Sequence, residues 1–190
     1  MNHFEQNGLD LIQCKSFLNP EQADWLYNYC LNNIKWGQDK YTFNGKTVLS
    51  PRMTSLYGSK SYSYSGQKLE LNPLTKPLER IIQLLHEKFG YDFNVILFNH
   101  YRNGNDSVSW HSDSEKELGT NPVIASLSLG GSKPFKFRNK KDKSEKKDFL
   151  LENGDLIIMK GTTQETWEHM IPKSKKYNDS RINLTIRKVI

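Results

Sequence analysis

A succession of short β-type segments fills the second half of this chain and limits its possible folds more than any other feature. Most of them are rich in β-branched or aromatic residues, and they span residues 94–101, 123–129, 134–138, 149–152, 156–160 and 181–189. Turn-forming sequences separate them at residues 103–106, 130–132 and 153–155. This spacing favours a double-layered barrel or jelly roll, which we place over residues 93–190.

Two helical patterns precede these strands. The first begins at Asn19, a capping residue followed by Pro20 at the first helical position. Its apolar stripe comprises Ala23, Leu26, Cys30, Leu31 and Ile34. The second helix follows Thr75 and ends at Gly90. Helices followed by strands are typical of an α+β fold, and a chain of 190 residues predicts a single domain over residues 1–190.

Composition excludes several classes of protein. No apolar run reaches the roughly 18 residues that a membrane span requires, and the N-terminus lacks the pattern of a signal peptide. Cys14 and Cys30 are too few for a disulfide framework. We therefore expect a soluble, monomeric, intracellular protein of the cytoplasm or nucleus, with no membrane partner.

Positive charge is concentrated in one segment. The net charge is +6, and residues 133–147 hold eight basic residues against two acidic ones. A basic surface suits a polyanion such as nucleic acid. A solvated, lysine-rich hairpin loop is the simpler explanation of a lysine run taken alone. Charge by itself leaves both interpretations open.

Residues 40–66 have a different texture, with aromatic residues set among Ser, Gly, Asn and Lys. Tyr62 and Tyr64 would share one face of a strand, because strand side chains alternate between faces. Phe43 precedes an Asn-Gly tight-turn signal. The ring of Phe43 belongs either to a surface that contacts a ligand or to the core of its hairpin.

Two histidines and one carboxylate are the strongest candidates for a catalytic centre. His111 and Asp113 lie in the sequence Trp-His-Ser-Asp, and His169 stands shortly before the last strand. Such a set holds a ferrous ion on one face and leaves three positions open for oxygen chemistry. A His-x-Asp pair alone is a weak signal, and a solvated loop histidine is the alternative for His111.

The last strand carries a row of polar side chains. The strand period of two puts four of them on one face: Arg181, Asn183, Thr185 and Arg187. The forked guanidinium of arginine pairs both oxygens of a carboxylate, so two arginines suit a small dicarboxylate. Asn99 and Tyr101 also share a face and could add neutral hydrogen bonds. The alternative is an edge strand with one wet face.

Several motifs appear in a fixed order along residues 40–188. They are Asn99-x-Tyr101, Asp106, Trp110-His111-x-Asp113, residues 124–130, Phe135-x-Phe137-Arg138, Gly154-Asp155-Leu156, His169 and Arg181-x-Asn183-x-Thr185-x-Arg187. In this order the chain resembles the AlkB family of Fe(II)/2-oxoglutarate dioxygenases, and its nucleic-acid repair branch in particular. The resemblance implies a jelly-roll core and three cofactors, which are Fe(II), 2-oxoglutarate and O₂.

The same resemblance implies roles for individual residues. The iron ligands, which are also the catalytic residues, would be His111, Asp113 and His169. The 2-oxoglutarate pocket would comprise Asn99, Tyr101, Arg181, Asn183, Thr185 and Arg187, with Arg181 on the distal carboxylate. A substrate lid over residues 40–66 and the loop after Asp113 would contribute Phe43, Arg52, Tyr62, Tyr64 and Glu115. The chain departs from the family pattern at Ser114-Glu115, where close relatives often carry Asp-Glu.

By resemblance we expect oxidative demethylation of N-alkylated bases in DNA, with RNA as the second candidate, and release of the alkyl carbon as an aldehyde. The base must leave the stack to reach the iron. One alternative is an oxygenase that acts on a protein or a small molecule. Another, from a different class, is a non-catalytic β-barrel that binds nucleic acid. Turnover of 2-oxoglutarate with methylated and plain oligonucleotides separates the three.

Overall fold

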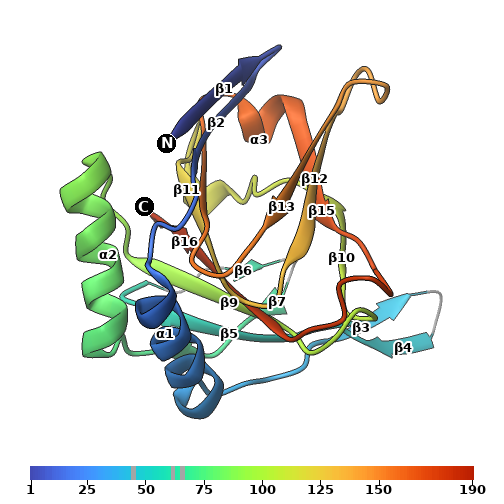
Figure 1. Cartoon of the computed structure of the whole chain (residues 1–190). Coiled ribbons are helices and arrows are strands. Elements are labelled where there is room, and N and C mark those ends of the chain that lie inside the picture. Colours follow the sequence, from blue (N-terminus) through green and yellow to red (C-terminus); the bar gives the residue numbers. More distant parts are fainter. Residues whose placement is uncertain (44–45, 61–62, 65–66) are drawn as a thin grey trace.

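Two facing β-sheets form the body of the protein in a computed structural model that describes residues 1–43, 46–60, 63–64 and 67–190 (Figure 1). The larger sheet has the order β1-β2-β14-β11-β16-β9-β5-β8. Its strands are β1 (Asn2–Gln6), β2 (Leu9–Cys14), β14 (Leu156–Lys160), β11 (Ile124–Gly130), β16 (Arg181–Arg187), β9 (Val95–Tyr101), β5 (Met53–Gly58) and β8 (Leu71–Asn72). The smaller sheet comprises β10 (Val108–His111), β15 (Trp167–Ile171), β12 (Lys133–Asn139) and β13 (Lys146–Leu151), in that order.

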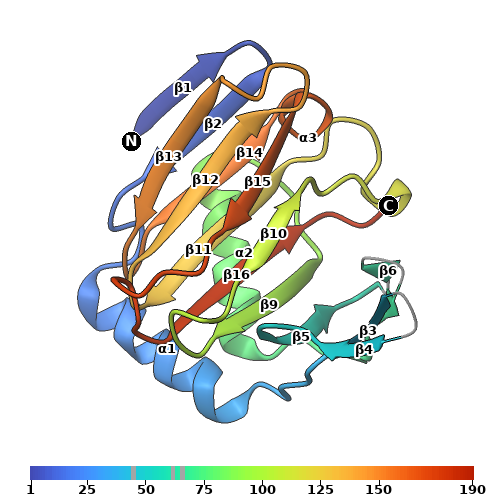
Figure 2. The same ribbon diagram turned by 90° about the vertical axis from the view of Figure 1, so that its right-hand side faces the viewer.

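The smaller sheet lies in front of the larger one in Figure 2, and this pairing confirms the predicted α+β jelly roll. Strand β9 shows how one sheet serves two cores. Its residues Val95 and Leu97 face the core between the sheets, whereas Ile96 and Phe98 face the helices. Strand side chains alternate between faces, so a strand buried on both sides is apolar throughout.

Two helices, α1 (Pro20–Asn33) and α2 (Lys76–Phe89), cover the outer face of the larger sheet (Figure 1). Asn19 caps α1 in a capping box with Gln22, and Gly90 ends α2 in the left-handed conformation at φ 73°. The predicted stripe of α1 is wrong at Leu31, which is 39% exposed. No helix among the described residues is long and apolar enough to cross a membrane.

The strands also begin earlier than the sequence predicted. A hairpin of β1 and β2 precedes α1, and β2 pairs with β14 to extend the larger sheet. The prediction missed this hairpin because β1 is polar and mostly exposed, so it lacks the pattern of a half-buried strand. The edge-strand interpretation of the last strand is wrong as well, since β16 lies between β11 and β9 in the middle of the sheet.

The predicted lid, residues 40–66, divides into two parts. Strands β3 (Lys40–Phe43) and β4 (Lys46–Leu49) form a small sheet, and β6 (Ser63–Tyr64) pairs with β7 (Gln67–Lys68); β3, β4 and β6 lie at the lower right of Figure 2. Strand β5, from the same range, pairs with β9 and belongs to the larger sheet. Tyr62 lies outside the described residues, as do the side chains of Phe43 and Tyr64.

Candidate metal and co-substrate site

The pairing of β10 with β15 brings the two predicted histidines together. These strands are antiparallel, and His111 stands opposite His169 in their register. The imidazole centroids lie 4.3 Å apart. Asp113 follows β10 closely enough that the ligand atoms of all three residues lie within 4.8 Å of one another. The three side chains can therefore hold a single metal ion.

The surroundings hold each of these side chains in its metal-binding protonation state. His169 is only 4% exposed, and burial, followed by repulsion from His111, lowers its pKa to about 3. Burial also lowers the pKa of His111. Both rings are therefore neutral near pH 7, which is the form that binds a metal. Burial is the largest single influence on Asp113 and would raise its pKa, but the charge and hydrogen bond of Arg187, together with the two neighbouring histidines, lower that pKa to about 2.

Hydrogen bonds hold two of these three residues in place, one through the side chain of His111 and one through the backbone of Asp113. His111 Nδ1 lies 2.8 Å from the carbonyl oxygen of Ser109. With the proton on Nδ1, Nε2 keeps its lone pair for a metal, and Nε2 lies 3.9 Å from Asp113 Oδ1. The backbone N–H of Asp113 donates to Gln164 Oε1 over 2.9 Å. Gln164 was not predicted from the sequence, because nothing in its local pattern marks a glutamine as the anchor of a distant loop.

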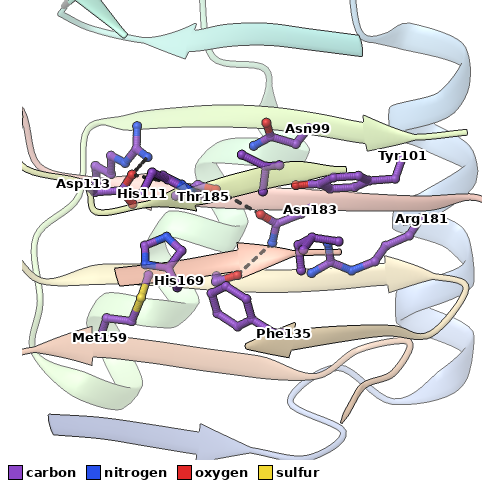
Figure 3. A pocket seen from close by; sticks show the side chains of 14 residues that line it. Asn99, Tyr101, His111, Asp113, Phe135, Met159, His169, Arg181, Asn183 and Thr185 are labelled. Carbon is purple, nitrogen blue, oxygen red and sulfur yellow. Dashed lines mark hydrogen bonds and ion pairs between the residues drawn. The ribbon is translucent and has the colours of Figure 1, made fainter. Parts of the chain in front are cut away.

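A second set of predicted residues lines the same pocket. Asn99 and Tyr101 come from β9, and the neighbouring β16 supplies the rest: Arg181, Asn183, Thr185 and Arg187. Figure 3 shows His111, Asp113 and His169 toward one end of this pocket and Tyr101 and Arg181 toward the other. Between them, Asn183 Nδ2 donates to Ser126 Oγ over 2.8 Å, and Thr185 Oγ1 donates to Asn183 Oδ1 over 2.9 Å. The polar side chains that alternate along this strand therefore form one wall of the pocket.

The two arginines that β16 contributes to the pocket have different partners. Arg187 Nη2 donates to Asp113 Oδ1 over 2.6 Å, and both side chains are buried. Arg181 is 1% exposed, and its Nη2 donates to the hydroxyl of Ser128 over 2.7 Å. Among the described residues, nothing accepts a hydrogen bond from Nε or Nη1 of Arg181. Burial lowers the pKa of Arg181 to about 10, so the group stays charged at pH 7 and suits an anion.

The predicted substrate residues that the structure describes, Arg52 and Glu115, lie near the pocket but are not exposed. Arg52 is buried, and its Nε donates to Asn99 Oδ1 over 2.7 Å. Glu115 is half-buried, and burial raises its pKa. Its Oε2 is a buried atom with no hydrogen-bond partner among the described residues. Arg52 therefore orients Asn99, which lines the pocket, and Glu115 has one buried oxygen without a partner among the described residues.

The basic segment, residues 133–147, is less available to phosphates than its composition predicted. Lys133 is fully buried, so this member of the segment does not present its charge to a nucleic acid. Other members pair with acids across the sheet: Lys136 with Asp148, and both Arg138 and Lys143 with Glu168. Lys141 and Lys146 are exposed. Much of the charge is therefore neutralised locally, because the antiparallel strands place acids opposite the lysines.

Comparison with known proteins shows which family the chain resembles in sequence. A family model described as the 2OG-Fe(II) oxygenase superfamily matches residues 10–187. The human alpha-ketoglutarate-dependent dioxygenase alkB homolog 3 is 38% identical over 182 residues, which cover 91% of this chain and 64% of that protein. The human DNA oxidative demethylase ALKBH2 is 34% identical over 200 residues, which cover 99% of this chain and 76% of that protein.

The chain belongs to the AlkB family of 2OG-Fe(II) oxygenases. The cofactors of this AlkB-family chain are Fe(II), 2-oxoglutarate and O₂. A solved structure titled "The structure of OsALKBH1" shares the fold with a TM-score of 0.66 at 18% identity, over 97% of this chain and all of that one. The chain spans slightly less than two thirds of the length of the human homolog 3.

Proposed function

We propose that this protein oxidatively demethylates N-alkylated bases in nucleic acid, with DNA as the first substrate and RNA as the second. The proposal rests on one pocket that is lined both by the His111, Asp113 and His169 cluster and by Arg181. Two nitrogens of the Arg181 guanidinium have no hydrogen-bond partner among the described residues. Fold alone does not define a substrate. The choice of nucleic acid rests on the likeness to relatives that are named DNA oxidative demethylases.

In this proposal, His111, Asp113 and His169 would hold Fe(II). Bound iron, with 2-oxoglutarate and O₂, supplies the oxidation of the alkyl carbon, which then leaves the base as an aldehyde. The chain contributes two neutral imidazoles and one ionised carboxylate. Phe135, Met159 and Ile171 line the pocket and keep bulk water from its apolar side.

The co-substrate takes the other end of the pocket. Arg181 would pair with the distal carboxylate of 2-oxoglutarate through its guanidinium, two of whose nitrogens have no partner among the described residues. Neutral hydrogen bonds from Asn99, Tyr101, Asn183 and Thr185 complete the pocket. Arg187 lines the same pocket, and its guanidinium also forms an ion pair with Asp113.

The substrate enters beside the lid. We assign Phe43, Tyr62 and Tyr64 to contacts with the flipped base and its neighbours, and Glu115 to recognition of the base edge through its Oε2. Arg52 supports these contacts from behind Asn99. In this proposal residues 1–190 act as one monomeric domain, with the lid in residues 40–66 and the jelly-roll core in residues 93–190, inside the cell.

The proposal is tested by the coupled turnover of 2-oxoglutarate with oligonucleotides. Purified protein with Fe(II) should form succinate and aldehyde with an N-methylated oligonucleotide, and far less with the same sequence unmethylated. Mass spectrometry of the digested oligonucleotide checks that the methyl group is removed. Turnover of 2-oxoglutarate that ignores methylation would favour a protein or small molecule as substrate. Nucleic-acid binding with no turnover under any condition would favour the non-catalytic barrel.

A further inference from the structure

Lys133 is the most unusual charged residue outside the metal cluster. It begins β12, and its side chain is 0% exposed. Its Nζ donates to the backbone carbonyls of Asn103, over 3.0 Å, and Tyr177, over 2.8 Å. No carboxylate among the described residues forms an ion pair with it. A buried ammonium without a counter-ion is costly, and a neutral side chain would fill the same space at lower cost.

Lys133 lies near the end of the pocket that Arg181 lines, because Gly130, three residues before it, pairs with Arg181 in the register of β11 and β16. Burial lowers the pKa of Lys133, and the next largest cause is repulsion from Arg181. Two acids, Asp106 and Asp179, counteract this repulsion from a distance, and the one with the larger effect, Asp106, already accepts three hydrogen bonds from Arg102. Two buried cations therefore influence one another at this end, and the described part of the chain supplies neither with a carboxylate in contact.

Lys133 also touches the two loops that flank Arg181. Asn103 belongs to the turn after β9, and Tyr177 belongs to the loop that leads into β16. These loops are joined without the lysine as well: Ser174 N donates to Gly104 O over 2.8 Å, and Gly104 N donates to Asn178 Oδ1 over 3.0 Å. Because other hydrogen bonds already fasten the loops, holding them together does not account for a buried positive charge.

We propose that Lys133 is a positioning residue of the co-substrate site, whose charge adds to that of Arg181 and selects a ligand with a carboxylate at this end of the pocket. Lys133 does not line the pocket and acts through the field at Arg181 and through the loops beside it. In a buried setting, a second positive charge strengthens the binding of an anion more than it would in water. This inference rests on the proposed role of Arg181.

Three variants separate charge from structure. Lys133→Met removes the charge and both hydrogen bonds, whereas Lys133→Gln removes the charge and keeps an N–H donor for the carbonyls. Lys146→Met is the matched control, because Lys146 is exposed on the neighbouring β13. Each protein is loaded with Mn(II), and the dissociation constants of 2-oxoglutarate and 2-oxobutyrate are measured without nucleic acid. 2-Oxobutyrate keeps the 2-oxo acid group but lacks the distal carboxylate.

We expect both Lys133 variants to weaken 2-oxoglutarate binding by about tenfold, which equals ~1.4 kcal/mol. Binding of 2-oxobutyrate should change by less than about twofold, because it has no carboxylate near Arg181. The control should match the wild type with both ligands. Should Lys133→Met fail to fold, Lys133→Gln carries the same comparison, since its amide keeps N–H donors for the two loop carbonyls.

Two results would overturn the inference. Equal weakening of both ligands, with a lower melting temperature, would make Lys133 a structural tie. Unchanged 2-oxoglutarate binding in Lys133→Gln would show that the charge is not used. Failure of the proposed function looks different: the wild type would bind 2-oxoglutarate selectively through Arg181 and Lys133 but leave methylated oligonucleotides intact. A wild type that binds no 2-oxoglutarate would overturn both.

Discussion

The two ends of β16 carry the same residue type on the same face with nearly the same burial, yet they differ in charge balance. At one end, Arg187 contacts Asp113 over 2.6 Å, so the ion pair is complete within the protein. At the other end, Arg181 contacts the neutral hydroxyl of Ser128 and keeps two nitrogens without a partner among the described residues. The first arginine stabilises a candidate metal ligand, and the second is the residue that we propose to bind an anionic ligand.

This difference shows that the role of a buried arginine depends on the partner that the fold places opposite it. The partner of Arg187 comes from a loop 74 residues away in the sequence, where Asp113 folds back over the strand. Arg181 faces Ser128 of β11, whose short side chain fills little space and brings no charge. The like charge of Lys133 adds to the excess at that end. The positive charge is therefore balanced by a carboxylate at the Arg187 end of the pocket, and no carboxylate of the described residues balances it at the Arg181 end.

Removal of the metal end should have the largest effect. We expect His169→Ala to abolish turnover completely and to weaken Mn(II) binding by at least two orders of magnitude, because one of three protein ligands is gone. Calorimetric titration with Mn(II) and an assay of 2-oxoglutarate consumption measure the two effects. His3→Ala, a change at an exposed histidine of β1, is the control. Normal consumption of 2-oxoglutarate by His169→Ala would refute the ligand assignment.

Removal of the anion end should be the next largest effect. Arg181→Met should raise the dissociation constant of 2-oxoglutarate by about two to three orders of magnitude, equal to ~3–4 kcal/mol, because a buried carboxylate is deprived of its charged partner. The free energy of unfolding of the ligand-free protein should change little, because no carboxylate among the described residues pairs with Arg181. Titration of the Mn(II)-loaded protein measures the binding. A rise below roughly threefold would contradict the role of Arg181.

The completed ion pair should behave in the opposite way. Arg187→Met should lower the free energy of unfolding of the metal-free protein by about 3–5 kcal/mol, because Asp113 stays buried with its charge uncompensated. Mn(II) should restore part of this stability by neutralising the same carboxylate. Denaturant unfolding with and without Mn(II) is the measurement. If Arg181→Met and Arg187→Met destabilise the metal-free protein equally, the contrast between the two ends is wrong.

A smaller effect concerns the ion pair between Asp106 and Arg102. Burial alone would raise the pKa of Asp106, but hydrogen bonds from Arg102 outweigh it and hold that pKa below its ordinary value. A lowered carboxyl pKa adds stability that is complete above about pH 4 and disappears as the pH falls through the folded-state value. Asp106→Asn should therefore cost about 1 kcal/mol at pH 7, reduced by solvent around the half-exposed Arg102.

Unfolding of Asp106→Asn and the wild type at pH 7 and at low pH checks this dependence. The difference between the two proteins should shrink as the pH falls. Asp148→Asn is the control, because its pair with Lys136 is exposed on both sides and contributes little. A difference that stays constant down to low pH would assign the role of Asp106 to its shape instead of its charge.

The smallest effect concerns the positive charges that face solvent. Neutralising Lys141 and Lys146 to Gln should lower the salt dependence of oligonucleotide binding by no more than about 0.9 log units for each duplex phosphate that the variant no longer binds. Lys76→Gln with Lys88→Gln on α2 removes the same charge from the opposite side of the molecule. Equal salt dependence of oligonucleotide binding in the two double variants would favour the interpretation of residues 133–147 as a solvated hairpin.

Local patterns in the sequence determined much of the fold. Asn19 and Gly90 mark helix ends because capping depends on the residue and its immediate neighbours. The alternation along β16 predicted the shared face of Arg181, Asn183, Thr185 and Arg187, because a strand has a period of two. The metal cluster was expected from its residue types and order, and the hairpin of β1 and β2 was missed because its outer strand is polar.

Only the tertiary structure decided which charges meet. Nothing in the sequence near Arg187 indicates Asp113, and nothing near Arg181 indicates that two of its nitrogens find no partner in the described part of the chain. Lys133 is one lysine among many in a basic segment, yet the fold buries it completely beside the co-substrate end. The physical reason is that helix caps and strand periods act over a few residues, whereas the balance of buried charge depends on strands and loops that are distant in sequence.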